Sequence, residues 1–195
     1  MFGWIKQSIW RHIQLYGLAT AYRDLANPVR LSCKHLACLA FVPLNDVVES
    51  FEILQKKAPN ECLTLYKYFE DYYIWKKKRG RALQALKDPH FTHVQWNVHD
   101  RTMDGMPRTS NNIEGWHNGF SGMVSKHPHL LVLIDAIKTE QSHTENNYIK
   151  LSTGRANSRK KRWVELEERI VNILKEYKKD SLEEWISNLS LLIQF

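Results

Sequence analysis

Residues 107–120, Pro107-Arg108-Thr109-Ser110-Asn111-Asn112-Ile113-Glu114-Gly115-Trp116-His117-Asn118-Gly119-Phe120, open a helix that the sequence predicts from about 112 to 126. Asn111 is a favourable N-cap, and Glu114 follows it at the spacing of a capping box. Apolar residues then recur every three or four positions, which predicts a helix face packed on a core: Ile113, Trp116, Phe120 and Val124. Glu114 therefore has two readings, a helix cap or a ligand for a cation.

This run, with Trp96-Asn97-Val98-His99-Asp100-Arg101-Thr102 ahead of it, resembles the Mutator-like (MULE) transposase family. In that family a run Arg-Thr-Asn-Asn-x-x-Glu-Gly-Trp-His carries the last of three catalytic acids. Shorter similarities follow in the same order along the chain, at residues 8–10, 39–43, 46–49, 68–71, 134–138 and 140–141. The whole chain thus resembles the C-terminal part of such a DDE transposase.

The resemblance implies a mainly α, multi-helix protein similar to the helical insertion and C-terminal helices of an RNase H-like transposase, with the catalytic β-sheet largely absent. Three regions are expected on this basis. Residues 1–75 form a helical insertion-like region, residues 76–110 a basic segment and loop, and residues 111–195 a C-terminal helical region that carries the motif.

In the resembled enzymes two aspartates and one glutamate hold two divalent cations that activate the nucleophile and stabilise the leaving oxygen. Glu114 corresponds to the third acid, and Asn111, Asn112, Trp116 and His117 belong to the same motif. The strands that bear the first two acids have no counterpart in this sequence. One carboxylate cannot hold two Mg²⁺ ions, so the chain by itself is expected to bind no cofactor and to lack catalysis. The alternative is an active site completed with Mg²⁺ or Mn²⁺, in trans or by missing upstream sequence.

Two further acids in the preceding loop, Asp100 and Asp104, allow a second interpretation. Together with Glu114 they could make a self-contained metal site, because carboxylate oxygens suit Mg²⁺ and Mn²⁺. The other reading is that these aspartates are solvated or paired with Arg101 and Arg108. The resemblance favours the second reading, because the first two acids of the family lie far upstream.

The net charge of +7 and the pI of about 9.3 indicate an acidic partner, with DNA as the first candidate. The candidate phosphate contacts are the cations of two clusters and of the motif: Lys76, Lys77, Lys78, Arg79, Arg81, Arg108, Arg155, Arg159, Lys160, Lys161 and Arg162. The clusters have an alternative reading as solvated linkers. Another transposase chain or a second copy of this chain is the other expected partner.

The three cysteines, Cys33, Cys38 and Cys62, make no disulfide framework and fit a reducing compartment. Cys33, His35 and Cys38 could suggest zinc, but they lie in an apolar helical pattern that favours buried core thiols. No stretch is apolar enough for a membrane span. The sequence therefore predicts an intracellular protein without a membrane partner, nuclear if the source is eukaryotic.

Other helices are predicted from local signals. Asn27-Pro28 is a cap followed by proline at the first helical position. An aromatic face could stack on nucleic-acid bases, although its helical spacing favours a core: Leu65, Tyr66, Phe69 and Tyr73. The clearest amphipathic helix lies near the C-terminus and carries Trp163, Leu166, Ile170, Ile173, Leu174 and Tyr177.

Overall fold

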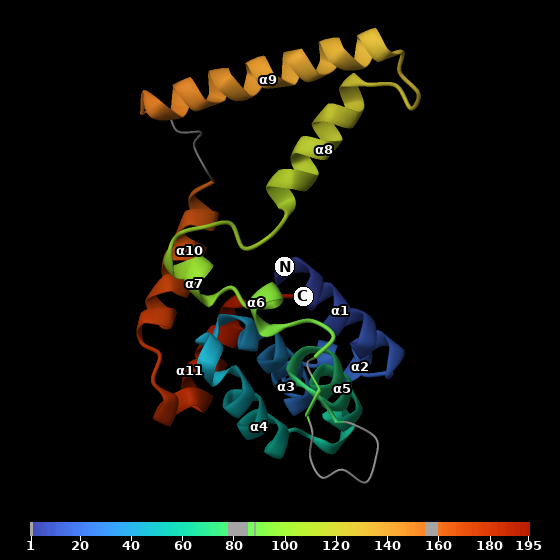
Figure 1. Ribbon diagram of the computed structural model, residues 1–195. Helices are drawn as coiled ribbons and strands as arrows, with labels where there is room; N and C mark the ends of the chain where they lie inside the picture. Colours follow the sequence, from blue (N-terminus) through green and yellow to red (C-terminus); the bar gives the residue numbers. More distant parts are fainter. Residues whose placement is uncertain (1, 78–85, 88, 155–159) are drawn as a thin grey trace. The chain divides into compact units, whose positions relative to one another are not determined.

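The computed structural model describes residues 2–77, 86–87, 89–154 and 160–195, and is mainly helical, as the sequence predicts (Figure 1). It contains two compact units. Unit 1 comprises Met1–Thr109 and Glu165–Phe195, and unit 2 comprises Ser110–Val164. This division differs from the three expected regions, because residues 165–195 pack with the N-terminal helices.

The helices of unit 1 are α1 (Phe2–Leu15), α2 (Ala19–Arg23), α3 (Pro28–Cys38), α4 (Val47–Lys56), α5 (Leu63–Phe69), α6 (His93–Trp96), α7 (His99–Met103), most of α10 (Lys161–Lys175) and α11 (Leu182–Leu192). A π-helical turn, Glu70–Ile74, extends α5. The strands described are β1 (Lys76–Lys77) and β2 (Leu86–Lys87), which pair antiparallel. Single 3₁₀ turns occur at Leu39–Phe41, Leu44–Asp46, Asn60–Cys62 and Lys179–Ser181.

Helix α3 lies at the centre of unit 1, where α1, α2, α4 and α11 pack around it (Figure 1). Its start confirms the local prediction, because Asn27 Oδ1 accepts a hydrogen bond of 2.9 Å from Val29 N and Pro28 occupies the first turn. Cys33 and Cys38 are fully buried on α3, and all three cysteines are free thiols. The prediction of core cysteines is confirmed.

Replacing Asn27 by alanine is expected to lower the free energy of unfolding by about 1 kcal/mol, within a range of about 0.5–2 kcal/mol, because Val29 N loses its acceptor. Urea unfolding followed by circular dichroism measures the change. Asn188→Ala, at an exposed position of α11, is the matched control. Equal effects of the two substitutions would contradict a capping role for Asn27.

The predicted aromatic face belongs to the core of unit 1 rather than to a base-stacking surface. Phe69 and Leu65 are fully buried, and Tyr66 and Tyr73 nearly so. The Phe69 ring stacks on Tyr73 with centroids 4.8 Å apart and meets Trp96 edge-on at 5.9 Å. Burial of these rings supplies apolar area that stabilises a helical unit of this size.

The C-terminal helices close the same core. Ile170 and Leu174 of α10 are buried, in agreement with the predicted amphipathic pattern, as are Trp185 and Ile186 of α11. Trp185 Nε1 donates a 2.6 Å hydrogen bond to the carbonyl of Ile173. These contacts explain why α11 belongs to unit 1.

A buried lysine connects α3 to α11. Lys34 is 8% exposed, and its Nζ donates a 2.9 Å hydrogen bond to the carbonyl of Ser190. Burial lowers the pKa of the ammonium, and nearby Arg30 lowers it further. The bond satisfies a charged donor that would otherwise be costly to bury.

Unit 2 is a helical hairpin of α8 (Asn111–Met123) and α9 (Leu130–Ser152) that ends near the start of α10. Four apolar side chains of the hairpin are half-buried: Phe120, Val124, Leu133 and Ala136. No residue of α9 is fully buried. Among its described residues, the hairpin therefore has a seam of partly buried side chains between the two helices and no fully buried core. Among the described helices, none is both long and apolar enough to cross a membrane.

Candidate functional site

The candidate site is centred on Glu114 in the first turn of α8. Ser110, not Asn111, is the N-cap residue: its carbonyl accepts the Glu114 backbone N–H at 2.9 Å, and its Oγ donates to Glu114 Oε1 at 2.7 Å. The predicted capping box from Asn111 was wrong, because the helix begins one residue earlier. The Glu114 side chain is exposed in the first turn of α8.

Trp116 connects the site to α9, the second helix of the hairpin. Its Nε1 donates a 2.6 Å hydrogen bond to Glu140 Oε1 of α9, and its ring stacks on Phe120 with centroids 5.5 Å apart. His117 meets the Trp116 ring edge-on at 4.9 Å. Sequence reasoning missed Glu140 as a partner, because the two residues are 24 positions apart and only the chain reversal brings them together.

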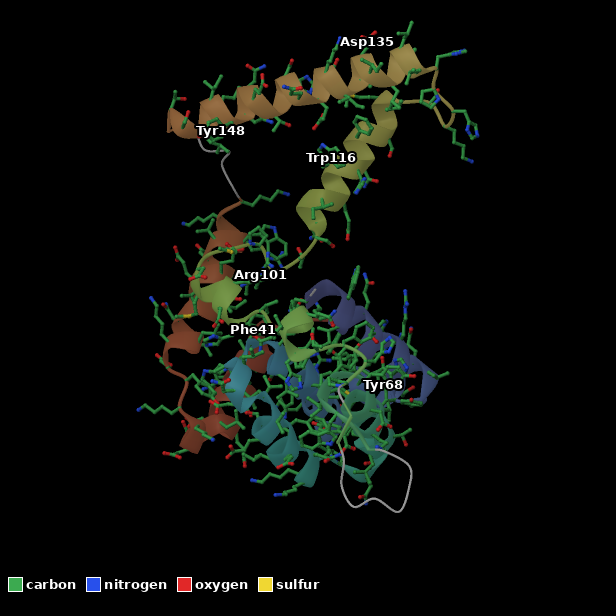
Figure 2. The ribbon with its side chains drawn as sticks, in the orientation of Figure 1. Phe41, Tyr68, Arg101, Trp116, Asp135 and Tyr148 are labelled. Carbon is green, nitrogen blue, oxygen red and sulfur yellow. The ribbon has the colours of Figure 1, made fainter. Side chains whose placement is uncertain are left out.

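The apolar stripe of α8 is not packed on a core, which corrects the sequence prediction. Ile113 is 60% exposed and Trp116 is 46% exposed. The same holds on α9, where Leu130 is 70% and Ile137 is 51% exposed; Figure 2 shows side chains standing along both helices. The described residues of unit 2 thus present apolar side chains that the hairpin itself does not cover.

The two acids that precede the motif, Asp100 and Asp104, lie in α7 and directly after it. Asp100 Oδ1 lies 2.8 Å from His99 Nδ1 within α7, and Asp104 follows the last residue of that helix. Across the described ranges, no group of three or more His, Cys, Asp or Glu residues is arranged to hold a metal ion.

The candidate DNA contacts are only partly described. Lys78, Arg79, Arg81, Arg155 and Arg159 lie outside the described residues. Lys76 and Lys77 form β1, and Lys160, Lys161 and Arg162 are exposed at and before the start of α10. Phosphate binding by these cations stays a prediction.

Arg108 contacts residues of unit 1, whereas Asn111 and Asn112 lie in the first turn of α8. The Arg108 guanidinium lies 3.9 Å from Glu167 and 6.0 Å from the ring centre of Phe41, both within unit 1. The side chain of Arg108 is 18% exposed, and its contact with Glu167 links the segment before α8 to α10. Asn111 is exposed at the start of α8, and Asn112 follows it in the same turn.

Comparison with protein-family models, with curated proteins and with solved structures gave no match.

Proposed function

We propose that this chain is a transposase-derived protein, similar to the C-terminal part of a Mutator-like DDE transposase, that docks through unit 2 on the RNase H-like sheet of another transposase chain. It has no strand-cleaving activity by itself. The observation that carries the proposal is the exposed apolar surface of α8 and α9, with Glu114 at one end of α8.

The exposed apolar residues of unit 2 follow helical spacing rather than a scattered pattern. Leu130, Ile134 and Ile137 recur at four and three residues along α9, and all three are exposed. Isolated exposed apolar residues are common, but an aligned set of this kind marks an interaction surface. A two-helix hairpin gains most of its stability from packing an apolar face against another layer.

An RNase H-like sheet suits this surface on two grounds. A sheet presents a broad apolar face on which helices pack. In the resembled family the motif helix carries the third acid of an active site built on such a sheet, so docking would bring Glu114 toward the two missing aspartates. Alone, the exposed Glu114 carboxylate offers too few oxygens for the octahedral shell of Mg²⁺.

A complementation experiment tests the docking. The partner is the catalytic chain of a Mutator-like transposase, cut before its own motif helix so that it keeps the sheet and both aspartates. We expect a stable one-to-one complex by size exclusion with light scattering. The double change Ile134→Asp with Ile137→Asp should abolish it, because charge replaces apolar contact.

The matched control is Asn146→Asp with Asn147→Asp, which adds the same charge to exposed polar positions of α9 and should leave the complex intact. Failure of the folded wild-type chain to associate would overturn the proposal. Self-association lost in the Ile134 and Ile137 variant, without binding to the transposase, would identify a second copy as the occupant instead.

Catalysis in trans is the second candidate, favoured by the placement of Glu114 in the first turn of an otherwise exposed helix. The same mixture is assayed for nicking of labelled duplex DNA with Mg²⁺ or Mn²⁺. Nicking that Glu114→Gln abolishes, while the complex persists, would establish that Glu114 completes the metal site. A complex without nicking would leave docking as the function.

A further inference from the structure

Among the described residues of unit 2, none covers the second half of α9. The half-buried residues of this helix, Leu133, Ala136 and Glu140, all lie in its first half, where Trp116 of α8 bonds to Glu140. Residues 141–152 are all exposed, and Figure 1 shows this end of α9 extending past α8. Because most helical stability in proteins comes from packing, an uncovered helical segment of this length is marginal in water. A partner surface would therefore stabilise this part of α9.

The exposed residues of α9 include a heptad pattern. Seven positions, spaced alternately by four and three residues, lie on one side of the helix: Leu130, Ile134, Ile137, Gln141, Thr144, Tyr148 and Leu151. This heptad face is exposed along its whole length, from Leu130 at 70% to Leu151 at 60%. Five of its residues are apolar, and the two polar ones, Gln141 and Thr144, lie in the middle. The spacing is that of a helix paired with a second helix in a coiled coil.

The heptad face matches itself when two copies of α9 run antiparallel. Its residues then meet those of the second copy in layers, each of which occurs twice about a two-fold axis: Ile134 with Leu151, Ile137 with Tyr148, and Gln141 with Thr144. Apolar side chains meet apolar side chains in the outer layers. In the central layers an amide meets a hydroxyl group, and the two can form a hydrogen bond. A polar layer of this kind fixes the register of a coiled coil at some cost in stability.

The charges beside the heptad face favour the same register. Lys138 and Glu145 lie on one flank of it, and in this register Lys138 of each copy is opposite Glu145 of the other. A shift by one heptad in either direction would instead place Lys138 opposite Lys138, or Glu145 opposite Glu145. A parallel pair would place Glu140 beside Glu145 of the second copy. Gln141 Nε2 donates a 2.9 Å hydrogen bond to Glu145 Oε1, which holds this carboxylate beside the heptad face.

We propose that α9 pairs antiparallel with α9 of a second copy of this chain, and that the free protein is a two-fold symmetric dimer. The heptad face contains Ile134 and Ile137, which the docking on a transposase sheet also needs. The dimer therefore covers the docking surface until a transposase chain replaces the second copy. This competition rests on the proposed function, whereas the pairing of the two α9 helices does not.

Sedimentation equilibrium of the full chain tests the pairing. We expect a species of twice the chain mass of 23.0 kDa, with a Kd of about 10 µM for a seam of three heptads with a polar layer. Lys138→Glu or Glu145→Lys places like charges on the flank at two positions of the dimer, and should weaken it about tenfold. Lys150→Glu, the same charge change at an exposed position away from the heptad face, is the matched control and should not weaken it.

A mixture of the two single variants is the decisive sample. Lys138→Glu in one chain and Glu145→Lys in the other restore opposite charges at both positions, so the mixture should associate within about threefold of the wild-type affinity. In a parallel pair, Glu145→Lys would bring a cation beside Glu140 and strengthen the dimer instead. Circular dichroism verifies the helix content of each variant.

Three results would overturn the pairing. These are a folded wild-type chain that stays monomeric at about 100 µM, single variants that associate as the wild type does, and a mixture that fails to restore the dimer. Lys138→Glu keeps Ile134 and Ile137, so it should still form the complex with the transposase chain. That complex without a wild-type dimer would overturn only the pairing, and a dimer without the complex would overturn only the docking. A larger complex that retains the dimer would overturn the competition.

Discussion

Phe41→Ala is expected to lower the free energy of unfolding of unit 1 by about 3–5 kcal/mol, the usual cost of removing a buried phenylalanine side chain. Phe41 has no exposed surface, and its ring meets Phe2 of α1 edge-on with centroids 4.8 Å apart. The Arg108 guanidinium lies over the same ring. One side chain therefore joins the start of α1, the turn after α3 and the segment before unit 2.

The size of this loss matters because domains of this class have total stabilities of about 5–15 kcal/mol. Urea unfolding followed by circular dichroism gives the change, and amide exchange in α1 and α3 locates it. Leu44→Ala, at a residue 37% exposed in the next turn, is the control and should cost less than about 1 kcal/mol. A loss for Phe41→Ala no larger than that of the control would contradict the packing of this turn.

Acid is expected to destabilise unit 1 by up to about 3 kcal/mol through His35 alone. Its pKa is lowered from 6.5 to about 4 in the folded state, and each unit of difference corresponds to about 1.4 kcal/mol. The unfolded chain binds the proton first, so stability falls as the pH drops below 6.5 and the loss is complete only below about 4. The nearby carboxylate of Glu183 raises the pKa of His35 and so offsets part of the lowering caused by burial.

Urea unfolding at several pH values between about 7 and about 4 measures this effect as a difference between wild type and variant. His35→Leu and His35→Gln should both flatten the pH dependence, the second without adding an apolar side chain. The pKa of His93 is lowered by burial as well, so a His93→Gln change should flatten it further. Identical pH slopes in wild type and both His35 variants would contradict the neutral buried imidazole.

Local sequence signals predicted the structure correctly where a few neighbouring residues determine it. Asn27-Pro28 sets the start of α3, because the cap bond reaches only two residues along the chain. The burial of Phe69 and Tyr73 followed from their helical spacing. The same spacing predicted burial of Ile113, which is exposed. Periodicity shows which side of a helix is apolar, but it does not show whether the chain supplies a surface to cover that side.

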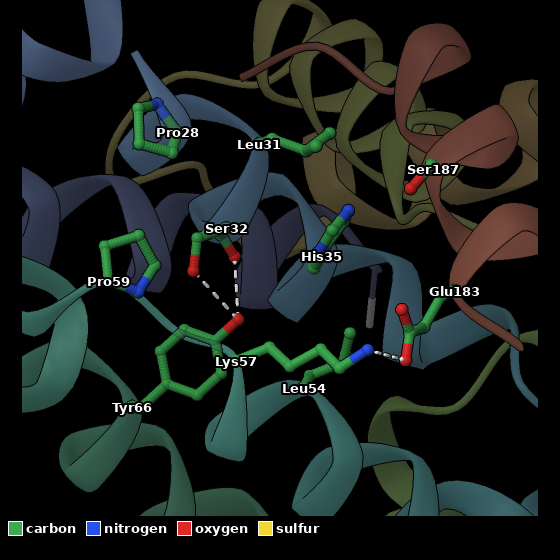
Figure 3. A pocket seen from close by; sticks show the side chains of 10 residues that line it. All are labelled: Pro28, Leu31, Ser32, His35, Leu54, Lys57, Pro59, Tyr66, Glu183 and Ser187. Atoms are coloured by element: carbon green, nitrogen blue, oxygen red, sulfur yellow. Dashed lines mark hydrogen bonds and ion pairs between the residues drawn. The ribbon is translucent and has the colours of Figure 1, made fainter.

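Non-local contacts explain the other differences. No local signal places α11 on α3, and none joins Trp116 to Glu140. At the site, the sequence identified Glu114 and its place in the first turn but named the wrong cap. His35 was considered with Cys33 as a zinc ligand, yet residues two apart on a helix do not share a face. Cys33 accordingly lies in the core, whereas His35 is only partly buried, beside the Lys57–Glu183 ion pair at a surface pocket of unit 1 (Figure 3).

The hydrogen bond from Lys34 to Ser190 spans 156 positions, and this has a consequence for synthesis on the ribosome. At about 5–20 residues per second, α3 is made about 8–30 s before the helix that covers it. All of unit 2 is translated in that interval. The nascent chain thus carries an α3 surface without its α11 cover for many seconds, until α11 emerges.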